Sequence, residues 1–227
     1  MIDKIVSSVA DAVEGIADGS VVLLGGFGAV GQANGLLAGL LEQGARDLTI
    51  VANNAGTGEG GLARLIGAGR VRRMVCSFPR GGAGVSVFEQ FYKAGRIELE
   101  IVPQGTLAER IRAAGAGIPA FFTPTSVGTV IAEGKEHREI NGRVAVLEYA
   151  LPGDVALVEA WEADRWGNLV YRASARNFNP LMAMAAKRTI VQANHVRELG
   201  TLSPEMIATP GIFVDRVVHV AATEASS

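Results

Sequence analysis

The stretch "LLGGFGAVGQANGLL", residues 23–37, carries the spacing G-x-G-x-x-G at Gly26, Gly28 and Gly31. It follows an apolar run and leads into a helical pattern, which is the usual setting of a dinucleotide-binding loop. Backbone amides at such a strand-to-helix turn can approach an anion or an acyl oxygen, because no side chain stands in the way. The same spacing also suits a tight turn packed beneath another loop. The glycines alone therefore leave a ligand site and a structural turn as equal alternatives.

A nicotinamide nucleotide is the first ligand to test against this loop. A dinucleotide site needs an acidic side chain at the end of the second strand, about 20 residues further on, to hold the ribose hydroxyls. Here the second strand is expected to end at Asn53 and Asn54, and the nearest acid, Asp47, lies at its beginning. A helix is also expected before the first strand, which is unusual for that fold. A nicotinamide enzyme is therefore the least favoured interpretation of the loop.

The first half of the chain alternates between helical and strand-like patterns. Apolar residues at helical spacing predict an amphipathic helix over residues 3–16. The segments that follow are expected to be a strand at 20–25, a helix at 32–43, a strand at 47–54, a helix at 60–69, a strand at 70–77, a helix at 85–95, a strand at 96–102 and a helix at 106–115. Thr106 and Glu109 have the spacing of a capping box at the start of the last helix. This alternation is typical of an α/β layer with a largely parallel sheet.

The pattern changes in the second half of the chain. Residues 116–129 are expected to form a long, weakly charged loop, and Asn141-Gly142 between two strand-like runs predicts a β-hairpin. Further segments are expected to be two strands about a turn at 166–168, a helix at 179–187 capped by Asn179, and strands at 188–194 and 212–220. The predicted fold class is therefore α/β: an open, largely parallel sheet flanked by helices, with an antiparallel addition. We expect a single domain over residues 1–220 and a disordered tail over 221–227.

Composition argues against several classes of protein. The net charge is −2 with no basic run, so a nucleic-acid partner is not expected. The single cysteine, Cys76, excludes an internal disulfide framework and fits a reducing cytoplasm, and the first residues lack the pattern of a signal peptide. Residues 20–41 are uncharged, but Gln32, Asn34 and the crowded glycines argue against a membrane-spanning helix. Three scattered histidines and one cysteine show no metal-binding spacing.

Beyond these patterns, the sequence resembles the family I coenzyme A transferases, specifically the A (alpha) subunits of 3-oxoacid CoA-transferases. The resemblance is carried, in the family's order, by "DGSVVLLGGFGAVGQA", "NNAGTGEGGLARLI", "PQGTLAERIRAAGAGIPAFFTPT", "VGTVIAEGKE", "ADRWGNLVYR", "ARNFNPLMAMAAK" and "TPGIFVDRVV". "CSFPR" and "DRWGNL" are most similar to the members that act on 3-oxoadipate. The family usually has proline where Ala33 stands and glycine where Ser126 stands.

The resemblance implies transfer of CoA from succinyl-CoA to a 3-oxoacid by nucleophilic catalysis through a glutamyl-CoA thioester, with ping-pong kinetics. In the family the attacking glutamate belongs to the B (beta) subunit. Rival acids in this chain are Glu59, Glu109, Glu148 and Glu159. The capping box accounts better for Glu109, and a paired structural acid accounts better for Glu148 and Glu159. We therefore expect half an enzyme, completed by a B subunit in an A2B2 assembly.

The resemblance also implies which residues of this chain take part. CoA binding is expected at the loop that comprises Gly25, Gly26, Phe27, Gly28, Ala29, Val30 and Gly31. Asn53, Asn54 and Gln104 are expected to end strands at the carboxyl edge of the sheet, where ligands bind in open α/β folds. Their amides could stabilise charge on an acyl oxygen, so we expect them to be catalytic; side chains that only cap loops are the competing interpretation.

Arg80 is the candidate for binding the acid substrate. A guanidinium pairs with carboxylate through two hydrogen bonds, so Arg80 could hold the far carboxylate of succinate or 3-oxoadipate; a solvated loop arginine is the competing interpretation. We expect a CoA thioester as substrate with no permanently bound cofactor and no metal, and a cytoplasmic location without membrane or nucleic-acid partners. An acetoacetate-specific transferase and a non-catalytic CoA-binding protein of the same fold remain alternatives.

Overall fold

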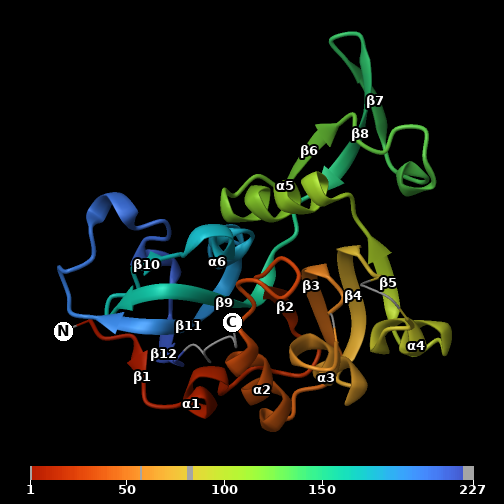
Figure 1. Cartoon of the computed structure of the whole chain (residues 1–227). Coiled ribbons are helices and arrows are strands. Elements are labelled where there is room, and N and C mark those ends of the chain that lie inside the picture. Colours follow the sequence, from red (N-terminus) through yellow and green to blue (C-terminus); the bar gives the residue numbers. More distant parts are fainter. Residues whose placement is uncertain (1, 57, 81–83, 222–227) are drawn as a thin grey trace.

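Figure 1 shows the computed structural model, which describes residues 2–56, 58–80 and 84–221. Within these residues, nine strands form one sheet, in the order β1-β12-β11-β9-β2-β3-β4-β5, with β10 paired to β9. All neighbours along this path run parallel, and the β9–β10 pair is antiparallel. The strands are β1 (Ile5–Val6), β2 (Val21–Leu24), β3 (Leu48–Asn54), β4 (Val71–Phe78), β5 (Glu98–Ile101), β9 (Gly153–Asp164), β10 (Leu169–Val170), β11 (Ala186–Arg197) and β12 (Arg216–His219). The predicted largely parallel sheet is confirmed.

Helices cover both faces of this sheet, with one apolar core beneath each layer (Figure 1). The first layer contains α1 (Val9–Val13), α2 (Asn34–Gln43), α3 (Gly61–Gly67) and α4 (Val87–Lys93). The second layer contains α5 (Gln104–Gly115) and α6 (Asn179–Met184). Short 3₁₀ helices lie at η1 (Val130–Ala132), η2 (Ala173–Arg176), η3 (Pro204–Met206) and η4 (Gly211–Phe213). The sheet is therefore buried between two helical layers, as parallel sheets require.

A small antiparallel sheet projects from the main body beyond α5 (Figure 1). Its strands are β6 (Ala120–Thr123), β7 (His137–Ile140) and β8 (Arg143–Tyr149), in the order β6-β8-β7. Asn141 and Gly142 have φ of 50° and 76° at the β7–β8 turn, which suits a tight hairpin. The predicted hairpin is confirmed, whereas the expected loop at 116–129 contains strand β6. That strand was missed because its pairing with β8 is not a local signal.

One arginine joins the small sheet to the main body. Arg110 on α5 donates from Nη1 to Oε1 of Glu100 at 2.7 Å and from Nε to the carbonyl oxygen of Tyr149 at 2.8 Å. Its Nε also lies 3.9 Å from Oε2 of Glu148, which is only 3% exposed. Glu148 in turn pairs with Lys135, so its carboxylate is surrounded by cations and acts as a structural ion pair.

The predicted helix over residues 3–16 is wrong in its first half. Ile5 and Val6 form β1 and pair in parallel with Val217 and Val218 of β12. Helix α1 begins only after Ser8, whose side chain caps it by accepting from the backbone N–H of Asp11. The apolar spacing is compatible with a helix, but pairing with a strand from the other end of the chain decides the conformation.

The predicted capping box at Thr106 and Glu109 is also wrong. Helix α5 begins earlier, directly after Pro103, so Thr106 is already inside the helix and is 4% exposed. Glu109 instead forms an ion pair with Arg112, three residues further on. Within the described residues, a capping box does occur at the start of α4, between Ser86 and Glu89.

Asn179 does not cap α6 as predicted, because the N-cap position is occupied by Phe178. Asn179 is the first helical residue, and its side chain is completely buried. Pro180 follows in the first turn, where its missing N–H costs no hydrogen bond. Its side chain instead forms hydrogen bonds with the backbone of Gly31 and of Glu159 on β9.

Two departures from the family pattern have different structural settings. Ala33 precedes α2 with φ of −74°, which is also a proline conformation, so a proline would fit the backbone there. Ser126 has φ of 76° in the left-handed region, and its buried Oγ has no hydrogen-bond partner in the described part of the chain. Glycine adopts that conformation without steric cost, so Ser126 introduces local strain.

Two further expectations concern a membrane span and the carboxyl-terminal tail. Among the described residues, the helices are all too short or too polar to cross a membrane. Residues 222–227 of the expected disordered tail lie outside the described residues.

Candidate functional site

The glycine loop, residues 25–31, turns sharply at the carboxyl end of β2. Its three motif glycines all have positive φ: 123° at Gly26, 63° at Gly28 and 71° at Gly31. Phe27 and Val30 exchange two backbone hydrogen bonds across the turn, at 3.0 and 3.2 Å. Their side chains are 50% and 48% exposed, so the tip of the loop carries an apolar surface. The spacing therefore marks a strand-to-helix turn, as predicted.

Packing explains why glycine stands at both ends of the loop. A Cβ on Gly25 would lie 1.8 Å from Oδ1 of Asn179, and one on Gly31 would lie 2.6 Å from the carbonyl oxygen of Ala175. A Cβ on Gly28 would meet no atom within 4 Å. Gly28 is thus required for its backbone conformation alone, and its surroundings leave space beside the turn.

Gln104 and Asn53 form an amide pair at the carboxyl edge of the sheet. Nε2 of Gln104 donates to Oδ1 of Asn53 at 2.6 Å, and Asn53 is 2% exposed. Gln104 was expected to end a strand, but β5 ends at Ile101 and Gln104 is the first residue of α5. The intervening Pro103 stops the strand and starts the helix. The structure therefore brings together two of the predicted catalytic amides.

Asn54 lies on the opposite face of the sheet from Asn53, because side chains alternate along a strand. Its Oδ1 accepts from the backbone N–H of Gly28 at 3.1 Å, which ties the glycine loop to the end of β3. Its Nδ2 is buried and has no partner among the described residues. An unpaired buried donor costs about 1–3 kcal/mol, so a ligand oxygen or a water that reached it would be favoured.

Neutral hydrogen-bond donors thus surround the end of β3. Such donors stabilise negative charge that develops on an oxygen, provided they are held in place before the reaction. They do not supply an attacking group. Burial raises the pKa of the Cys76 thiol to about 12, so it is not a thiolate near neutral pH.

The four glutamates considered as rivals occupy different environments. Glu59 is exposed, Glu109 pairs with Arg112, and Glu148 is enclosed by Lys135 and Arg110. Glu159 is the remaining acid. The ion pair of Glu148 matches the paired structural acid predicted from the sequence, whereas Glu109 forms an ion pair with Arg112 and not the predicted capping box.

Glu159 lies on β9 beside the glycine loop. With Val30, Gly31 and Trp161 it lines a hollow of about 450 Å³. Its Oε2 accepts from Nε2 of Gln192 at 3.3 Å, and Oε1 of Gln192 accepts from backbone N–H groups at the start of α2. Burial raises the pKa of the Glu159 carboxyl. The side-chain partner of Glu159 is thus the neutral amide of Gln192, so the paired structural acid predicted from the sequence is wrong for Glu159.

Arg80 follows the end of β4 and makes its ion pair with α4. Its Nε is 3.2 Å from Oε1 of Glu89 on α4, and its side chain is 82% exposed. An exposed pair of this kind contributes little to stability and can exchange partners readily. The neighbouring residues 81–83 lie outside the described part of the chain.

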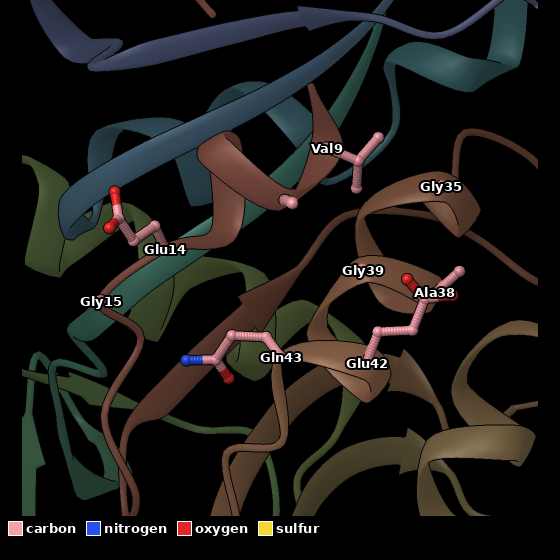
Figure 2. Close-up of a pocket in the computed structure, with 9 residues that line it drawn as sticks. Val9, Glu14, Gly15, Gly35, Ala38, Gly39, Glu42 and Gln43 are labelled. Carbon is pink, nitrogen blue, oxygen red and sulfur yellow. The ribbon is translucent and has the colours of Figure 1, made fainter. Parts of the chain in front are cut away.

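A second hollow, of about 500 Å³, lies between α1 and α2 (Figure 2). Gly35 and Gly39 face it from α2, and a Cβ on Gly39 would lie 2.4 Å from Val9. Its titratable lining residues are Glu14 and Glu42. None of the predicted site residues lines this hollow, so it is separate from the candidate site.

Metal-binding side chains are not clustered in the described ranges. No group of three or more histidine, cysteine, aspartate or glutamate side chains lies close enough to bind a metal ion there.

Comparison with known proteins decides the family. A sequence model described as Coenzyme A transferase matches residues 6–220. This chain belongs to the coenzyme A transferase family. The chain is 61% identical to the A subunit of 3-oxoadipate CoA-transferase from Pseudomonas putida, over all of this chain and 98% of that protein. It is 48% identical to the A subunit of a probable succinyl-CoA:3-ketoacid coenzyme A transferase from Bacillus subtilis (strain 168), over 97% of this chain and 92% of that protein.

A solved structure confirms the CoA-transferase fold. An acyl-CoA transferase of Escherichia coli O157:H7 superposes with a TM-score of 0.85 and 20% identity, over 99% of this chain and 49% of that chain. At this identity the match concerns the fold alone. Both the family resemblance and the fold class predicted from the sequence are thus confirmed.

Sequence reasoning missed two residues of this CoA-transferase chain that contact the loop, Asn177 and Asn179. The sequence "NFNP", residues 177–180, fits the start of a helix, which is the role predicted for Asn179. No local signal could have shown that these side chains turn back toward residues 25–31.

The raised pKa of Glu159 gives a prediction for stability against pH. Because the folded chain binds this proton more tightly than the unfolded chain, ionisation of Glu159 should destabilise the fold as pH rises through the raised pKa. Glu159→Gln cannot ionise, so it should gain stability over the original chain between about pH 4, near the ordinary glutamate pKa, and neutral pH. Urea unfolding at several pH values measures the difference. Glu139→Gln, on exposed β7, is the control; a difference that did not change with pH would contradict the assignment.

Proposed function

We propose that this chain is the A subunit of a 3-oxoacid CoA-transferase that moves CoA from succinyl-CoA to 3-oxoadipate. The observation that carries this proposal is the 61% identity, over the full chain, to the A subunit of a 3-oxoadipate CoA-transferase. The arrangement of amides at the carboxyl edge supports the same chemistry, since acyl transfer requires preset donors for an oxyanion.

Within this proposal the glycine loop receives the CoA thioester. Its tip is exposed, its glycines leave the backbone accessible, and its apolar side chains Phe27 and Val30 can contact the pantetheine arm. Gln104, Asn53 and Asn54 are the proposed catalytic residues. Asn54 has a buried N–H donor without a partner among the described residues, which favours an acyl oxygen at that position.

The attacking carboxylate is proposed to come from a partner B subunit. A glutamate oxygen would attack the thioester carbonyl, forming a mixed anhydride and releasing CoA as its thiolate. The thiolate then attacks the glutamyl carbonyl, which forms the glutamyl-CoA thioester and releases the first acid. The second acid reverses both steps. This division is supported by the names of the two relatives, both of them A subunits, and by the ion pairs of Glu109 and Glu148.

Assembly, substrate and location complete the proposal. An A2B2 assembly follows from the family resemblance. A CoA thioester as substrate, without a permanently bound cofactor, fits an edge built from amides. A cytoplasmic location fits a chain whose single cysteine is a buried thiol.

Acetoacetate is the second candidate acceptor. It is favoured by the 48% identity to the A subunit of a probable succinyl-CoA:3-ketoacid coenzyme A transferase. The two candidates differ in chemistry, because 3-oxoadipate carries a second carboxylate and acetoacetate does not.

The division of labour can be tested by assaying this chain alone and mixed with a candidate B subunit. We expect transfer of CoA from succinyl-CoA only in the mixture. Hydroxylamine trapping after incubation with acyl-CoA should label a glutamate of the B subunit. Activity of the isolated chain, or a label on Glu159 of this chain, would show that the attacking group lies in the A subunit.

Gln104 should act on the reaction as well as on stability, because its loss takes a donor from the buried side-chain oxygen of Asn53. Gln104→Ala removes a donor at the acyl oxygen, which typically lowers kcat by about 10²–10³-fold. Gln90→Ala, an exposed glutamine on α4, should leave kcat unchanged. Steady-state kinetics of the mixed enzyme measures both variants. Equal kcat in the two variants would remove Gln104 from the mechanism.

Arg80 should affect acids with two carboxylates only. Arg80→Met removes the guanidinium proposed to pair with the far carboxylate, so the KM for succinate or 3-oxoadipate should rise while that for acetoacetate stays the same. The matched control is Arg72→Met, whose guanidinium pairs with Glu98 at an exposed position. Similar effects of Arg80→Met on all three acids would reject the proposed contact.

A further inference from the structure

Asn177 spans the turn of the glycine loop with a single carboxamide. Its Oδ1 accepts from the backbone N–H of Gly26 at 3.0 Å, before the turn. Its Nδ2 donates to the carbonyl oxygen of Val30 at 3.1 Å, after the turn. The same two atoms also bond the backbone of Phe178 and Ser174, which fixes the orientation of the amide. Both ends of the turn are therefore held by one side chain.

Asn179 holds the exit of the loop. It is completely buried, and its Nδ2 donates to the carbonyl oxygens of Gly31 at 2.9 Å and Ala175 at 2.8 Å. Its Oδ1 accepts from the backbone N–H of Glu159 at 3.1 Å. This amide thus connects the loop, η2 and β9, and all its polar atoms have partners.

Steric fit links the two asparagines to particular glycines. Oδ1 of Asn179 occupies the space that a Cβ on Gly25 would need, at 1.8 Å. Nδ2 of Asn177 lies 2.9 Å from the position of a Cβ on Gly31. Part of the glycine pattern therefore exists to admit these two amides, and not only to admit a ligand.

We propose that Asn177 and Asn179 are positioning residues for the transferase reaction, because they hold residues 25–31 in the conformation that receives the CoA thioester. This rests on the proposed function of the loop. A loop with four glycines has many conformations available when unbound, so ordering it costs free energy. The two amides supply that order in the folded chain before substrate arrives.

A carboxamide suits this role because it offers an acceptor and a donor on one short side chain. An aspartate in place of Asn177 would keep the acceptor for Gly26 but would set a carboxylate oxygen against the carbonyl oxygen of Val30. Misplacement of a reacting group by about 1 Å can cost about 10²-fold in rate. Loosening of the turn should therefore appear in catalysis before it appears in stability.

The test compares Asn177→Asp and Asn177→Ala with the original chain, each mixed with the B subunit. We expect kcat/KM for succinyl-CoA to fall by about 10–100-fold, with thermal unfolding shifted by no more than the control shifts it. Asn177 is preferred to Asn179 for this test, because Asn177 is only half-buried, whereas Asn179 is completely buried and its loss would leave a cavity and an unpaired carbonyl oxygen at the buried Gly31.

Gln43→Ala is the matched control. Gln43, visible in Figure 2, also joins two backbone groups with one amide: it donates to the carbonyl oxygen of Ile16 and accepts from the N–H of Ala45. It holds a turn at the other end of α2. Its loss should cost comparable stability and leave kcat/KM unchanged.

Hydrogen exchange of the loop amides gives a second readout that needs no activity. Without substrate, the Gly26 N–H should exchange faster in both Asn177 variants than in the original chain and in Gln43→Ala. Unchanged exchange, or unchanged kcat/KM despite faster exchange, would overturn the positioning role. If the original chain and its partner show no transferase activity, the proposed function fails, while the exchange data still decide whether Asn177 holds the loop.

Discussion

The parallel pairing of β2 with β3 on one side and β9 on the other is the constraint on which the candidate site depends. Leu23 pairs with both Val51 and Ala156, so the three strands run side by side in one direction. Their carboxyl ends therefore face the same edge. Because β2 ends at Leu24, before its two neighbours end, the glycine loop that follows it lies between the last residues of β3 and the second half of β9. The glycine loop meets Asn54 on one side and Glu159 on the other for this reason.

At that edge the backbone leaves the sheet, so its N–H and C=O groups no longer form hydrogen bonds with neighbouring strands. Carboxamide side chains replace them: Asn54 for Gly28, Asn177 for Gly26 and Val30, and Asn179 for Gly31. Neutral amides satisfy buried backbone groups without burying a charge, which would be costly. They also suit acyl chemistry, which needs hydrogen-bond donors held in place around a developing oxyanion.

Local signals predicted much of this architecture. The alternation of helices and strands, the glycine turn and the hairpin at Asn141 are each indicated by residues close together in the sequence, and each is found in the structure. The general rule that ligands bind where parallel strands end placed Gln104 and Asn53 at the same edge, and their side chains are hydrogen-bonded there, although Gln104 begins α5 and does not end a strand. The errors arose where contacts between distant residues determine the conformation. Ile5 forms a strand because it pairs with β12, and the side chain of Asn179 bonds the glycine loop and does not cap α6. Such contacts have no periodicity and no fixed spacing, so the sequence alone could not show them.

The attachment of the small antiparallel sheet has a consequence for which residues can stand at position 110. One guanidinium reaches a carboxylate on β5 and a carbonyl on β8 at the same time, through different nitrogens. Lysine has a single terminal nitrogen and could not span both acceptors in this fork-like way. A lysine at position 110 would therefore keep the charge and still lose one of these two contacts between the small sheet and the main body.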